Sequence, residues 1–300
     1  MEILPGIHEL RETLAPVFPD PRLWTSVYLL VGEQDCAFVD SAVPRSADRL
    51  ILPYLDKVGI PADRLRFIVN THGHNDHVGS NVRLREVCGA KIMLHEADAH
   101  WLDEGHMFGD DQVPVHQPDQ TLRAGDQVEL GAATYEVLSL AGHTAGSLGL
   151  WDSRARVLFC GDSLQGEGVV SAGLAFYLDP DAYAASVERA LSLGVEHLCT
   201  AHPYAPATAS HTHGAAEVRD YLERSRDFVR NYDSEIVETL EAAGEPQSAR
   251  RIATAACARR GLPTSNFMAD GVTQAHLERL EARGTLRKVR AEPRPLWRLV

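Results

Sequence analysis

The feature that most constrains this chain is the segment at residues 70–79, which reads Asn-Thr-His-Gly-His-Asn-Asp-His-Val-Gly. Within six residues it places four side chains with metal-binding atoms: His72, His74, Asp76 and His77. Imidazole and carboxylate groups are good ligands for a borderline metal ion such as zinc. Without an ion, three imidazoles and a carboxylate packed this closely would gain little and would repel on protonation. The segment therefore predicts a metal-binding loop rather than a polar surface turn.

The residues before this segment explain why it should form a loop. Residues 65–69 read Leu-Arg-Phe-Ile-Val, which is typical of a short buried strand, so the cluster begins where the strand ends. Binding sites are often built on such loops. In an extended turn, side chains two positions apart point the same way, so His72 and His74 are expected to converge on one ion. Asp76 and His77 would then face a second ion.

Length and composition fit an ordinary soluble globule. The 300 residues suit one large domain, or one domain with an appendage, and 44% apolar with 24% charged residues is unremarkable. No run of about eighteen apolar residues occurs, and the first residues lack the basic start of a signal peptide. The five cysteines are odd in number and widely spaced, which favours reduced, buried thiols. We therefore expect a cytoplasmic protein without disulfides or membrane segments.

The charge is uneven along the chain and predicts two parts. Residues 215–300 hold 15 Lys and Arg against 13 Asp and Glu, so the net charge of −13 arises entirely from residues 1–214. This change supports a boundary that separates residues 1–213 from residues 214–300, which we call the cap. An acidic body repels polyanions at long range, which argues against general nucleic-acid binding.

Apolar runs and turn residues predict strands that alternate with helices through the first part. Residues 46–58 have apolar side chains at helical spacing, although Pro53 predicts a kink or a shorter helix. A second helix is expected at residues 78–87, after the metal loop. Alternation of this kind implies a sheet with parallel or mixed strands. Besides residues 65–69, the expected strands cover residues 7–10, 26–31, 36–40, 90–94, 127–130, 134–140, 147–151, 156–160 and 195–200.

Three further strand ends carry a metal-binding side chain. His143 follows an apolar run in Ala-Gly-His-Thr-Ala-Gly-Ser, Asp162 follows one in Cys-Gly-Asp-Ser, and His202 follows one in Ala-His-Pro-Tyr. A lone histidine or aspartate at the start of a loop is more often structural than metal-bound. These three, however, end strands in a chain that already contains the cluster at residues 70–79, which makes them candidate ligands.

Taken together, the four motifs, in this order and spacing, resemble those of the metallo-β-lactamase-fold hydrolase superfamily over roughly residues 3 to 210. The resemblance implies an α/β fold, an αββα sandwich of two mixed sheets with metals at the rim of the sheets. It also implies a seven-ligand set similar to that of glyoxalase II and of related thioesterases, lactonases and nucleases. The implied ligands are His72, His74 and His143 for the first metal, Asp76, His77 and His202 for the second, and Asp162 as the bridge.

Two departures from the family pattern bear on the activity. The last ligand commonly lies in a Gly-His-Gly context, whereas His202 lies between Ala201 and Pro203. Asp162 stands where many β-lactamases of this fold have a cysteine ligand. This difference argues against antibiotic hydrolysis.

The resemblance predicts a hydrolase with two divalent ions, most simply Zn²⁺, with Fe or Mn as alternatives. A hydroxide bridging ions about 3.5 to 4 Å apart would attack an ester or thioester, because dications lower the pKa of bound water to roughly 7. Asp76 would orient this water and take its proton. The expected partner is a small-molecule substrate, whose tail could be anionic and meet arginines of the cap.

Three other activities stay open from the sequence. One is a metal-dependent phosphodiesterase or ribonuclease. The second is a persulfide dioxygenase, which resembles this fold but uses one iron held by residues matching His72, His143 and Asp162. The four additional ligands favour two metals over one. The third is a scaffold that retains the fold without turnover, which the intact ligand set argues against.

The ligand set does not select the substrate, so other segments must do so. Residues 163–171 are rich in glycine and are expected to form a loop over the site. Tyr177 and Tyr183 are candidate donors of a hydrogen bond to a developing oxyanion, but we expect an aromatic residue of the core or of the rim in preference to this role. Asp179 and Pro180 predict the start of a helix. Four histidines lack a compact ligand spacing and are expected at the surface or at the mouth of the site: His95, His100, His106 and His116.

The cap should be mainly helical. Residues 214–243 have an apolar helical face that must pack on the body or on a partner subunit, so a homodimer is one of two arrangements expected. The rest predicts helices at 247–260 and 272–283 and a ribbon of strands 285–289 and 296–299 around residues 292–294. This order resembles a winged-helix module. Winged helices often bind DNA, but acidic residues alternate with the basic ones here, so we do not expect nucleic acid as the partner. The basic residues in question are Arg279, Arg283, Arg287, Lys288, Arg290, Arg294 and Arg298.

Overall fold

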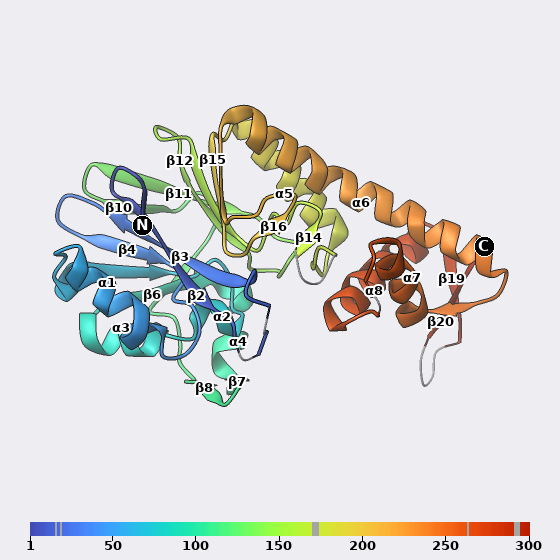
Figure 1. The fold of residues 1–300 in the computed structure, drawn as a ribbon, viewed down its shortest axis with the longest axis horizontal. Helices are drawn as coiled ribbons and strands as arrows, with labels where there is room; N and C mark the ends of the chain where they lie inside the picture. The colour runs from blue at the N-terminus through green and yellow to red at the C-terminus, as the bar shows by residue number, and fades with distance from the viewer. Residues whose placement is uncertain (16, 19, 170–173, 263, 291–294) are drawn as a thin grey trace.

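The structure is a computed structural model, and it describes the whole chain except residues 16, 19, 170–173, 263 and 291–294. Two mixed sheets pack face to face with helices on both outer faces, and a helical region lies at one end (Figure 1). The αββα sandwich expected from the sequence is therefore confirmed.

The first sheet has seven strands. Its first four strands pair antiparallel with one another, whereas the pairs β4–β5, β5–β6 and β6–β9 are parallel. The sheet is thus mixed, as the alternation of strands and helices predicts. The strand order is β1 (Glu2–Leu4), β2 (Ile7–Thr13), β3 (Trp24–Val31), β4 (Cys36–Val39), β5 (Leu65–Val69), β6 (Lys91–His95) and β9 (Gln120–Leu122).

The second sheet has six strands and is also mixed. An antiparallel meander of four strands is extended by β15, which pairs parallel with β13, and then by the antiparallel β17. The strand order is β10 (Gln127–Leu130), β11 (Ala133–Ser139), β12 (Leu148–Asp152), β13 (Val157–Gly161), β15 (His197–Thr200) and β17 (His211–His213).

Alternating side chains of β3 show how the layers are held together. Tyr28 and Leu30 are buried in the cluster between the sheets, where the Tyr28 ring lies 5.2 Å from that of Phe159. Val27 and Leu29 belong to the cluster under the helices on the outer face. Successive side chains of a strand point to opposite faces. Because both faces are covered, β3 reads as an almost continuous apolar run.

The outer helices lie close to the predicted positions. The helix expected at residues 46–58 covers nearly that span but is irregular: a π-helical turn leads directly into α1, and the change lies beside Pro53, which has no N–H to donate. On the second sheet, α5 begins where expected, because the Asp179 carboxylate accepts hydrogen bonds from the N–H groups of Asp181 and Ala182. These elements are the turn Ala47–Ile51, α1 (Leu52–Lys57), α3 (Asn81–Cys88) and α5 (Pro180–Leu193).

The helix after the metal loop differs from the prediction. Instead of one helix from residue 78, a short helix, α2 (Asn75–Val78), precedes α3 and includes Asp76 and His77. The backbone N–H of His77 donates to the carbonyl of His74, which closes this helical turn. The expectation of an extended turn throughout residues 72–77 was therefore wrong for its second half.

Several small elements lie in the connections between the larger strands and helices. Part of the segment at residues 163–171 forms a strand that pairs with the residues after His202, and residues 170 and 171 lie outside the described part of the chain. The small elements are the 3-10 turns Ala62–Arg64 and Glu96–Asp98, α4 (His100–Asp103), the hairpin β7 (His106–Phe108) and β8 (Asp111–Val113), and the pair β14 (Gly168–Val169) and β16 (Tyr204–Ala205).

The cap consists of three helices and a three-stranded sheet in the order β18, β20, β19. Two predicted bounds were wrong. The last helix begins at Phe267 rather than at residue 272, because the Asn266 side chain caps it by accepting from the N–H of Ala269. The helix expected from residue 247 begins at Ala249, because Gln247 and Ser248 form the strand β18, which is too short to show a pattern in the sequence. The predicted turn at residues 292–294 lies outside the described residues. The elements are α6 (Ala215–Ala243), β18 (Gln247–Ser248), α7 (Ala249–Arg259), α8 (Phe267–Ala282), β19 (Leu286–Arg290) and β20 (Leu296–Leu299).

Helix α6 joins the cap to the sandwich (Figure 1). It packs on α5 near the sheets and on α7 and α8 in the cap, so its apolar face is covered within the chain. One hydrophobic cluster runs from Leu158 in β13 through Val187 and Phe228 to Trp297 in β20. The division at residue 214 stays a prediction, but this shared core shows that the cap is held firmly on the body.

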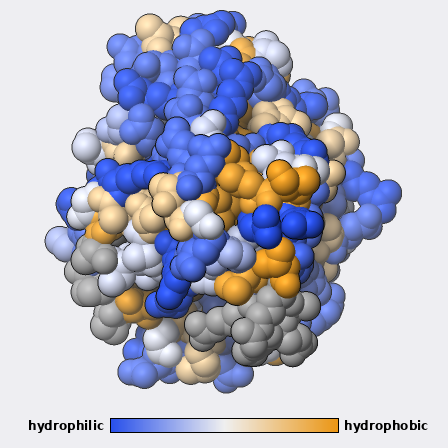
Figure 2. Space-filling view, turned by 90° about the vertical axis from the view of Figure 1, so that its right-hand side faces the viewer, coloured by the Kyte–Doolittle hydropathy of each residue, from blue (hydrophilic) through white to orange (hydrophobic). Residues whose placement is uncertain are grey.

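The face of the molecule at the cap end is mostly polar (Figure 2). Seen from the cap end, hydrophilic residues dominate, and hydrophobic residues gather near the middle of that face (Figure 2). Among the described residues, no helix combines the length and the apolarity that crossing a membrane requires. All five cysteines are buried free thiols.

Candidate metal centre

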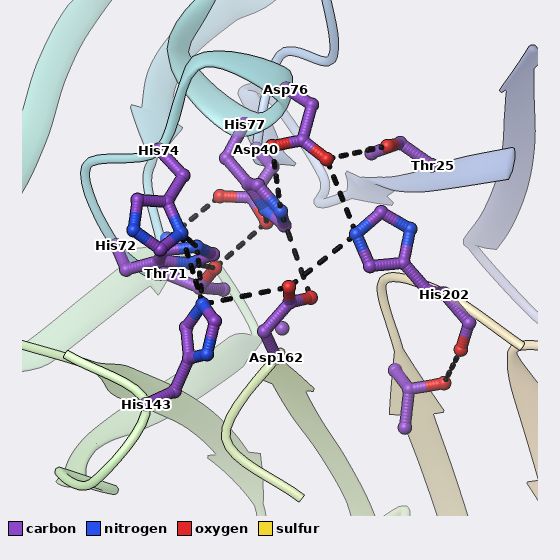
Figure 3. Close-up of polar contacts among 12 residues, drawn as sticks. Thr25, Asp40, Thr71, His72, His74, Asp76, His77, His143, Asp162 and His202 are labelled. Atoms are coloured by element: carbon purple, nitrogen blue, oxygen red, sulfur yellow. Dashed lines mark hydrogen bonds and ion pairs between the residues drawn. The ribbon is translucent and has the colours of Figure 1, made fainter. Parts of the chain in front are cut away.

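The seven predicted ligands meet at one edge of the two sheets (Figure 3). They come from segments that are far apart in the sequence, and most of them follow the last residue of a strand closely. Strand ends that face the same edge bring their following residues together, which is why single residues at such positions form one site. The ligands are His72 and His74 after β5, Asp76 and His77 on α2, His143 after β11, Asp162 after β13 and His202 after β15.

Three imidazoles form one compact group. The Nε2 atoms of His72 and His143 lie 3.2 Å apart, and the Nδ1 atom of His74 lies 3.0 Å from each of them. In a tetrahedral site with metal–nitrogen bonds of 2.0–2.1 Å, ligand nitrogens are about 3.3 Å apart. The spacing of this tripod is therefore close to what one zinc-sized ion requires.

The remaining four ligands form a second group beside the tripod. The Nε2 atom of His202 lies 3.2 Å from Asp76 and 3.4 Å from Asp162, and that of His77 lies 3.6 Å from Asp162. Asp162 also contacts the tripod, because one of its carboxylate oxygens lies 3.6 Å from the Nε2 atom of His143. Asp162 thus lies between the two groups, in the position that a bridging ligand would need.

Buried polar atoms in this site lack partners. The His77 Nε2 and one Asp162 oxygen are buried without a hydrogen bond among the described residues. Buried polar groups are nearly always hydrogen-bonded, so two neighbouring buried atoms without a partner indicate that a further group, such as an ion, binds there. A divalent cation between these atoms would satisfy both.

The other ring nitrogens of the histidines fix the tautomer that metal binding needs. The Nδ1–H groups of His77, His143 and His202 donate to Asp40, the Phe176 carbonyl and the Trp24 carbonyl, at 2.9, 2.7 and 2.7 Å. Each of these bonds leaves a lone pair on Nε2 pointing into the site. Such supporting bonds are typical of metal-ligating histidines. The residues present therefore fit divalent metal ions.

The electrostatics of the two groups differ. Burial and neighbouring imidazoles lower the pKa of the tripod histidines, that of His74 to about 3, so these rings are neutral at neutral pH. Burial also opposes a charge on His77, but Asp76, Asp162 and Asp40 raise its pKa to about 9. Two carboxylates raise the pKa of His202 in the same way. The second group therefore has to exchange protons for a cation when metal binds.

A cavity of about 530 Å³ opens above these ligands. Its floor, as we call it, consists of the five ligands that line it: His74, Asp76, His143, Asp162 and His202. Most of the other lining side chains are apolar and form what we call the apolar wall. The wall comprises Leu14, Val17, Phe18 and Leu23 between β2 and β3, Trp101, Met107 and Phe108 near β7, Phe176, and Phe267 and Met268 of the cap. The volume lies within the range of about 300–1,000 Å³ that is usual for small-molecule sites.

Comparison with known proteins identifies the family. A sequence model of the metallo-beta-lactamase superfamily matches residues 22–227. A hydroxyacylglutathione hydrolase from Methylococcus capsulatus is 31% identical over 205 residues, which cover 66% of this chain and 71% of that protein. The chain belongs to the metallo-beta-lactamase superfamily. A hydroxyacylglutathione hydrolase from Vibrio cholerae is 30% identical over 227 residues, covering 75% of this chain and 78% of that protein.

Solved structures support the fold of this superfamily member along its whole length. A metallo-beta-lactamase family protein from Thermus thermophilus has a TM-score of 0.78 at 22% identity and covers 100% of both chains. A beta-lactamase domain protein from Burkholderia ambifaria has a TM-score of 0.75 at 21% identity, covering 100% of this chain and 93% of that one. Membership of the superfamily and the hydrolase relatives indicate a metal-dependent hydrolase that uses divalent ions.

Two aspartates that support the ligands of this hydrolase were missed by sequence reasoning. Asp40, at the end of β4, accepts hydrogen bonds from the N–H and the hydroxyl of Thr71 at 2.7 and 2.8 Å, and from His77. It has a φ of 61°, which aspartate tolerates better than most residues. Asp98 accepts from the N–H groups of Gly73 and Gly146 and from the Thr144 hydroxyl. Asp98 thereby ties the loop of His72 and His74 to that of His143.

One glycine lets the two sheets approach each other beside the ligands. Gly161 precedes Asp162 and has a φ of 52°. A Cβ atom there would lie 2.3 Å from the hydroxyl oxygen of Thr71. Any side chain would push apart the strands that deliver His72 and Asp162.

The two tyrosines considered as oxyanion donors lie in the core, which was the position expected for them in preference to the site. Tyr177 and Tyr183 are fully buried and stack on each other at 4.1 Å, and neither lines the cavity. The Tyr177 hydroxyl donates to His276 Nε2, and the Tyr183 hydroxyl accepts from the N–H of Gln165. The tyrosine that does line the cavity is Tyr204, whose buried hydroxyl has no hydrogen-bond partner among the described residues. The nearby motif Ala-His-Pro-Tyr was the one signal that could have indicated it.

The histidines of residues 95–116 mostly have structural contacts. His95 accepts from the N–H of Ala97, and the Nδ1 atoms of His100 and His116 lie within hydrogen-bond distance of backbone carbonyls. Of the four, His106 lines the cavity. The prediction that such residues lie at the surface or at the mouth of the site fits His95, His100 and His106, but not His116, which is buried and lies 3.1 Å from the Asn81 side chain.

Several basic side chains of the cap are already paired. Arg279 and Arg283 contact Asp181 of α5 at 3.1 and 2.7 Å, and Lys288 lies 4.0 Å from Glu281. These contacts join the cap to the body or neutralise charge within the cap. They weaken the case for a phosphate-binding surface.

Proposed function

We propose that the chain is a dinuclear hydrolase of esters or thioesters. The observation that carries this proposal is the position of Asp162 between two groups of ligand atoms, in contact with His143 on one side and with His77 and His202 on the other. Five imidazoles and two carboxylates suit Zn²⁺ best, with Fe or Mn as alternatives. Two divalent ions held there would supply an activated water and polarise the substrate carbonyl.

The side chains of the site have distinct roles in this proposal. Asp76 lies in the floor, where its carboxylate accepts a hydrogen bond from the Thr25 hydroxyl at 3.3 Å and keeps lone pairs for a proton from the attacking water. The Tyr204 hydroxyl, which makes no hydrogen bond within the described part of the chain, would donate to an oxygen that gains charge in the reaction. The apolar wall keeps bulk water away from the reacting carbonyl, which strengthens both interactions.

The ester or thioester class is supported by the two relatives described as hydroxyacylglutathione hydrolases. The substrate is then a small molecule with an acyl group. A cytoplasmic location is part of the same proposal and is supported by five buried free thiols.

Metal analysis and a substrate panel test the proposal together. Protein purified without chelator should hold close to two divalent ions per chain, and removing them should abolish hydrolysis of simple esters and thioesters. One iron per chain, with oxygen uptake on a persulfide, would instead indicate a mononuclear dioxygenase. Turnover of a phosphodiester in place of acyl substrates would favour the nuclease alternative.

A further inference from the structure

The apolar wall is uncharged. Among the described residues that line the cavity, none is Lys or Arg, and the carboxylates present are the ligands Asp76 and Asp162. A substrate carboxylate placed against this wall would lose its hydration without gaining a cationic partner, which is costly.

Exposed apolar side chains concentrate at this wall. The described residues include nine large apolar side chains that are well exposed, and three of them line the cavity: Val17, Met107 and Phe267, with exposed fractions of 39%, 56% and 65%. Away from the chain ends, Phe267 is the most exposed of the nine. Apolar groups gathered in this way, rather than scattered singly, mark a binding surface.

Phe267 connects the cap to the metal ligands through one intervening ring. Its ring meets that of Phe176 edge to face, with centroids 6.2 Å apart, and Phe176 meets the His143 ring at 5.5 Å. Gly271, one turn further along α8, makes room for this contact, since a Cβ there would lie 3.0 Å from the Phe176 ring. Glycine is a poor helix former, so its place inside α8 fits a need for close packing.

The cap holds Phe267 in place without a ligand. On α8, His276 accepts a hydrogen bond from the Tyr177 hydroxyl at 2.8 Å, and Arg283 pairs with Asp181 of α5 at 2.7 Å. Both body residues lie within a few positions of Phe176. A wall that is already ordered binds an apolar group without a further cost in conformational entropy.

We propose that the apolar wall binds a neutral aryl or alkyl group, so that this enzyme acts on uncharged apolar esters or thioesters rather than on anionic glutathione conjugates. The proposal rests on ester or thioester hydrolysis at the metal centre. It replaces the anionic tail expected from the sequence with an apolar one. Phe267 and Met268 make the cap a specificity element of the catalytic site.

A binding measurement tests the wall without requiring turnover. The probes are two thioethers that cannot be hydrolysed, S-octyl-N-acetylcysteamine, which is neutral, and S-octylglutathione, which carries two carboxylates and one ammonium group. Calorimetric titration of the full chain should show at least tenfold tighter binding of the neutral probe. Phe267→Ala should weaken that binding about tenfold, the effect of losing ~55 Å² of apolar contact. Equal or tighter binding of S-octylglutathione would overturn the proposal.

A matched control separates the wall from general effects on the cap. Val289 is an exposed apolar residue of β19 that does not line the cavity, and Val289→Ala should leave both affinities unchanged. Phe267→Lys should narrow or reverse the preference by supplying the missing cation. If Phe267→Ala behaves like Val289→Ala, the cap does not form part of the binding site and the proposal fails.

Hydrolysis of two octanoyl thioesters, one of N-acetylcysteamine and one of glutathione, distinguishes the proposed function from the proposed preference of the wall. A higher kcat/KM for the neutral thioester, reduced by Phe267→Ala, supports both. Turnover of both thioesters at equal kcat/KM would leave the proposed function standing and remove the wall preference. If neither thioester is hydrolysed by metal-loaded protein, ester or thioester hydrolysis fails, while the thioether affinities still decide what the wall binds.

Discussion

The floor and the apolar wall of the same cavity are built in opposite ways. The floor consists of charged or titratable side chains held by buried hydrogen bonds, such as that from His143 to the Phe176 carbonyl. The wall consists of apolar side chains, several of them exposed, from four separate parts of the chain. The difference indicates that the residues for bond cleavage and the residues that select the substrate can be changed separately. Changes in the floor should alter metal content and kcat, whereas changes in the wall should alter the choice of substrate.

The largest effect is expected from the ligand between the two metal groups. Asp162→Asn removes the charge that faces His77, His143 and His202 while keeping the side-chain shape. Metal content should fall below two per chain, and hydrolysis should drop by more than the ~10–100-fold typical of supporting residues. Elemental analysis and kcat/KM measure these effects. Asp152→Asn is the control, because Asp152 is a buried aspartate that bonds only to nearby backbone N–H groups among the described residues. Two metals and full activity in Asp162→Asn would contradict the bridging role.

A smaller effect is expected from the aspartate behind the floor. Asp40→Asn weakens the acceptor for His77 Nδ1–H and for the Thr71 hydroxyl. Supporting bonds of this kind are worth about 10–100-fold in metal affinity or activity. Chelator competition should therefore show weaker metal binding, while KM of the metal-saturated variant stays near that of the parent. An unchanged metal affinity would mean that Asp40 only supports the backbone turn.

Tyr204 lines the cavity but belongs to neither the floor nor the apolar wall, and Tyr204→Phe tests what its hydroxyl does. The substitution removes one buried hydroxyl that lacks a hydrogen-bond partner among the described residues, so the free energy of unfolding should stay equal or rise slightly. If the hydroxyl donates to the substrate, kcat should fall by about 2–10-fold, the value of one neutral hydrogen bond of ~0.5–1.5 kcal/mol. Denaturant unfolding and steady-state kinetics together separate the two roles. A loss of stability without a change in kcat would assign Tyr204 to the core.

The sequence predicted the floor much better than the wall, for physical reasons. Ligands such as His72 and His74 lie close together and follow a strand, so their chemistry shows in a short stretch of residues. The wall unites side chains that are up to 254 positions apart, such as Leu14 and Met268, and only the packing of α8 on α5 and α6 brings them together. Tyr177 illustrates the same limit: its position in the sequence allowed both the site and the core, and only the packing places it in the core.

The residues that hold the ligands in place could not be predicted from the sequence for a different reason. Asp40 and Asp98 are single acidic residues whose roles depend on backbone groups from other loops, so no spacing rule identifies them. The short helix α2 was missed because four residues are too few for a helical pattern to show. What the sequence could predict was which metal-binding side chains lie close together and where most of the strands lie along the chain. The tertiary structure adds which carbonyls and carboxylates hold those ligands in position.

The smallest expected effect concerns the support of the wall. His276 on α8 is fully buried, accepts from the Tyr177 hydroxyl and donates to Asp233 at 2.6 Å. Burial lowers its pKa, against the opposing influence of Asp233. Because the folded pKa lies below the unfolded value of about 6.5, its contribution to stability is complete above that pH and is lost as the pH falls below it.

The free energy of unfolding of metal-free protein should therefore decrease from pH 7 to pH 5, and part of that decrease should be absent in His276→Gln, which cannot gain the proton. Other groups titrate in this range, including the floor histidines, so the difference between the two proteins is the quantity that isolates His276. The preference for the neutral thioether should weaken over the same range in the parent alone, because α8 carries Phe267. A parallel pH dependence in both proteins would show that the cap is held on the body by its apolar core rather than by this buried histidine.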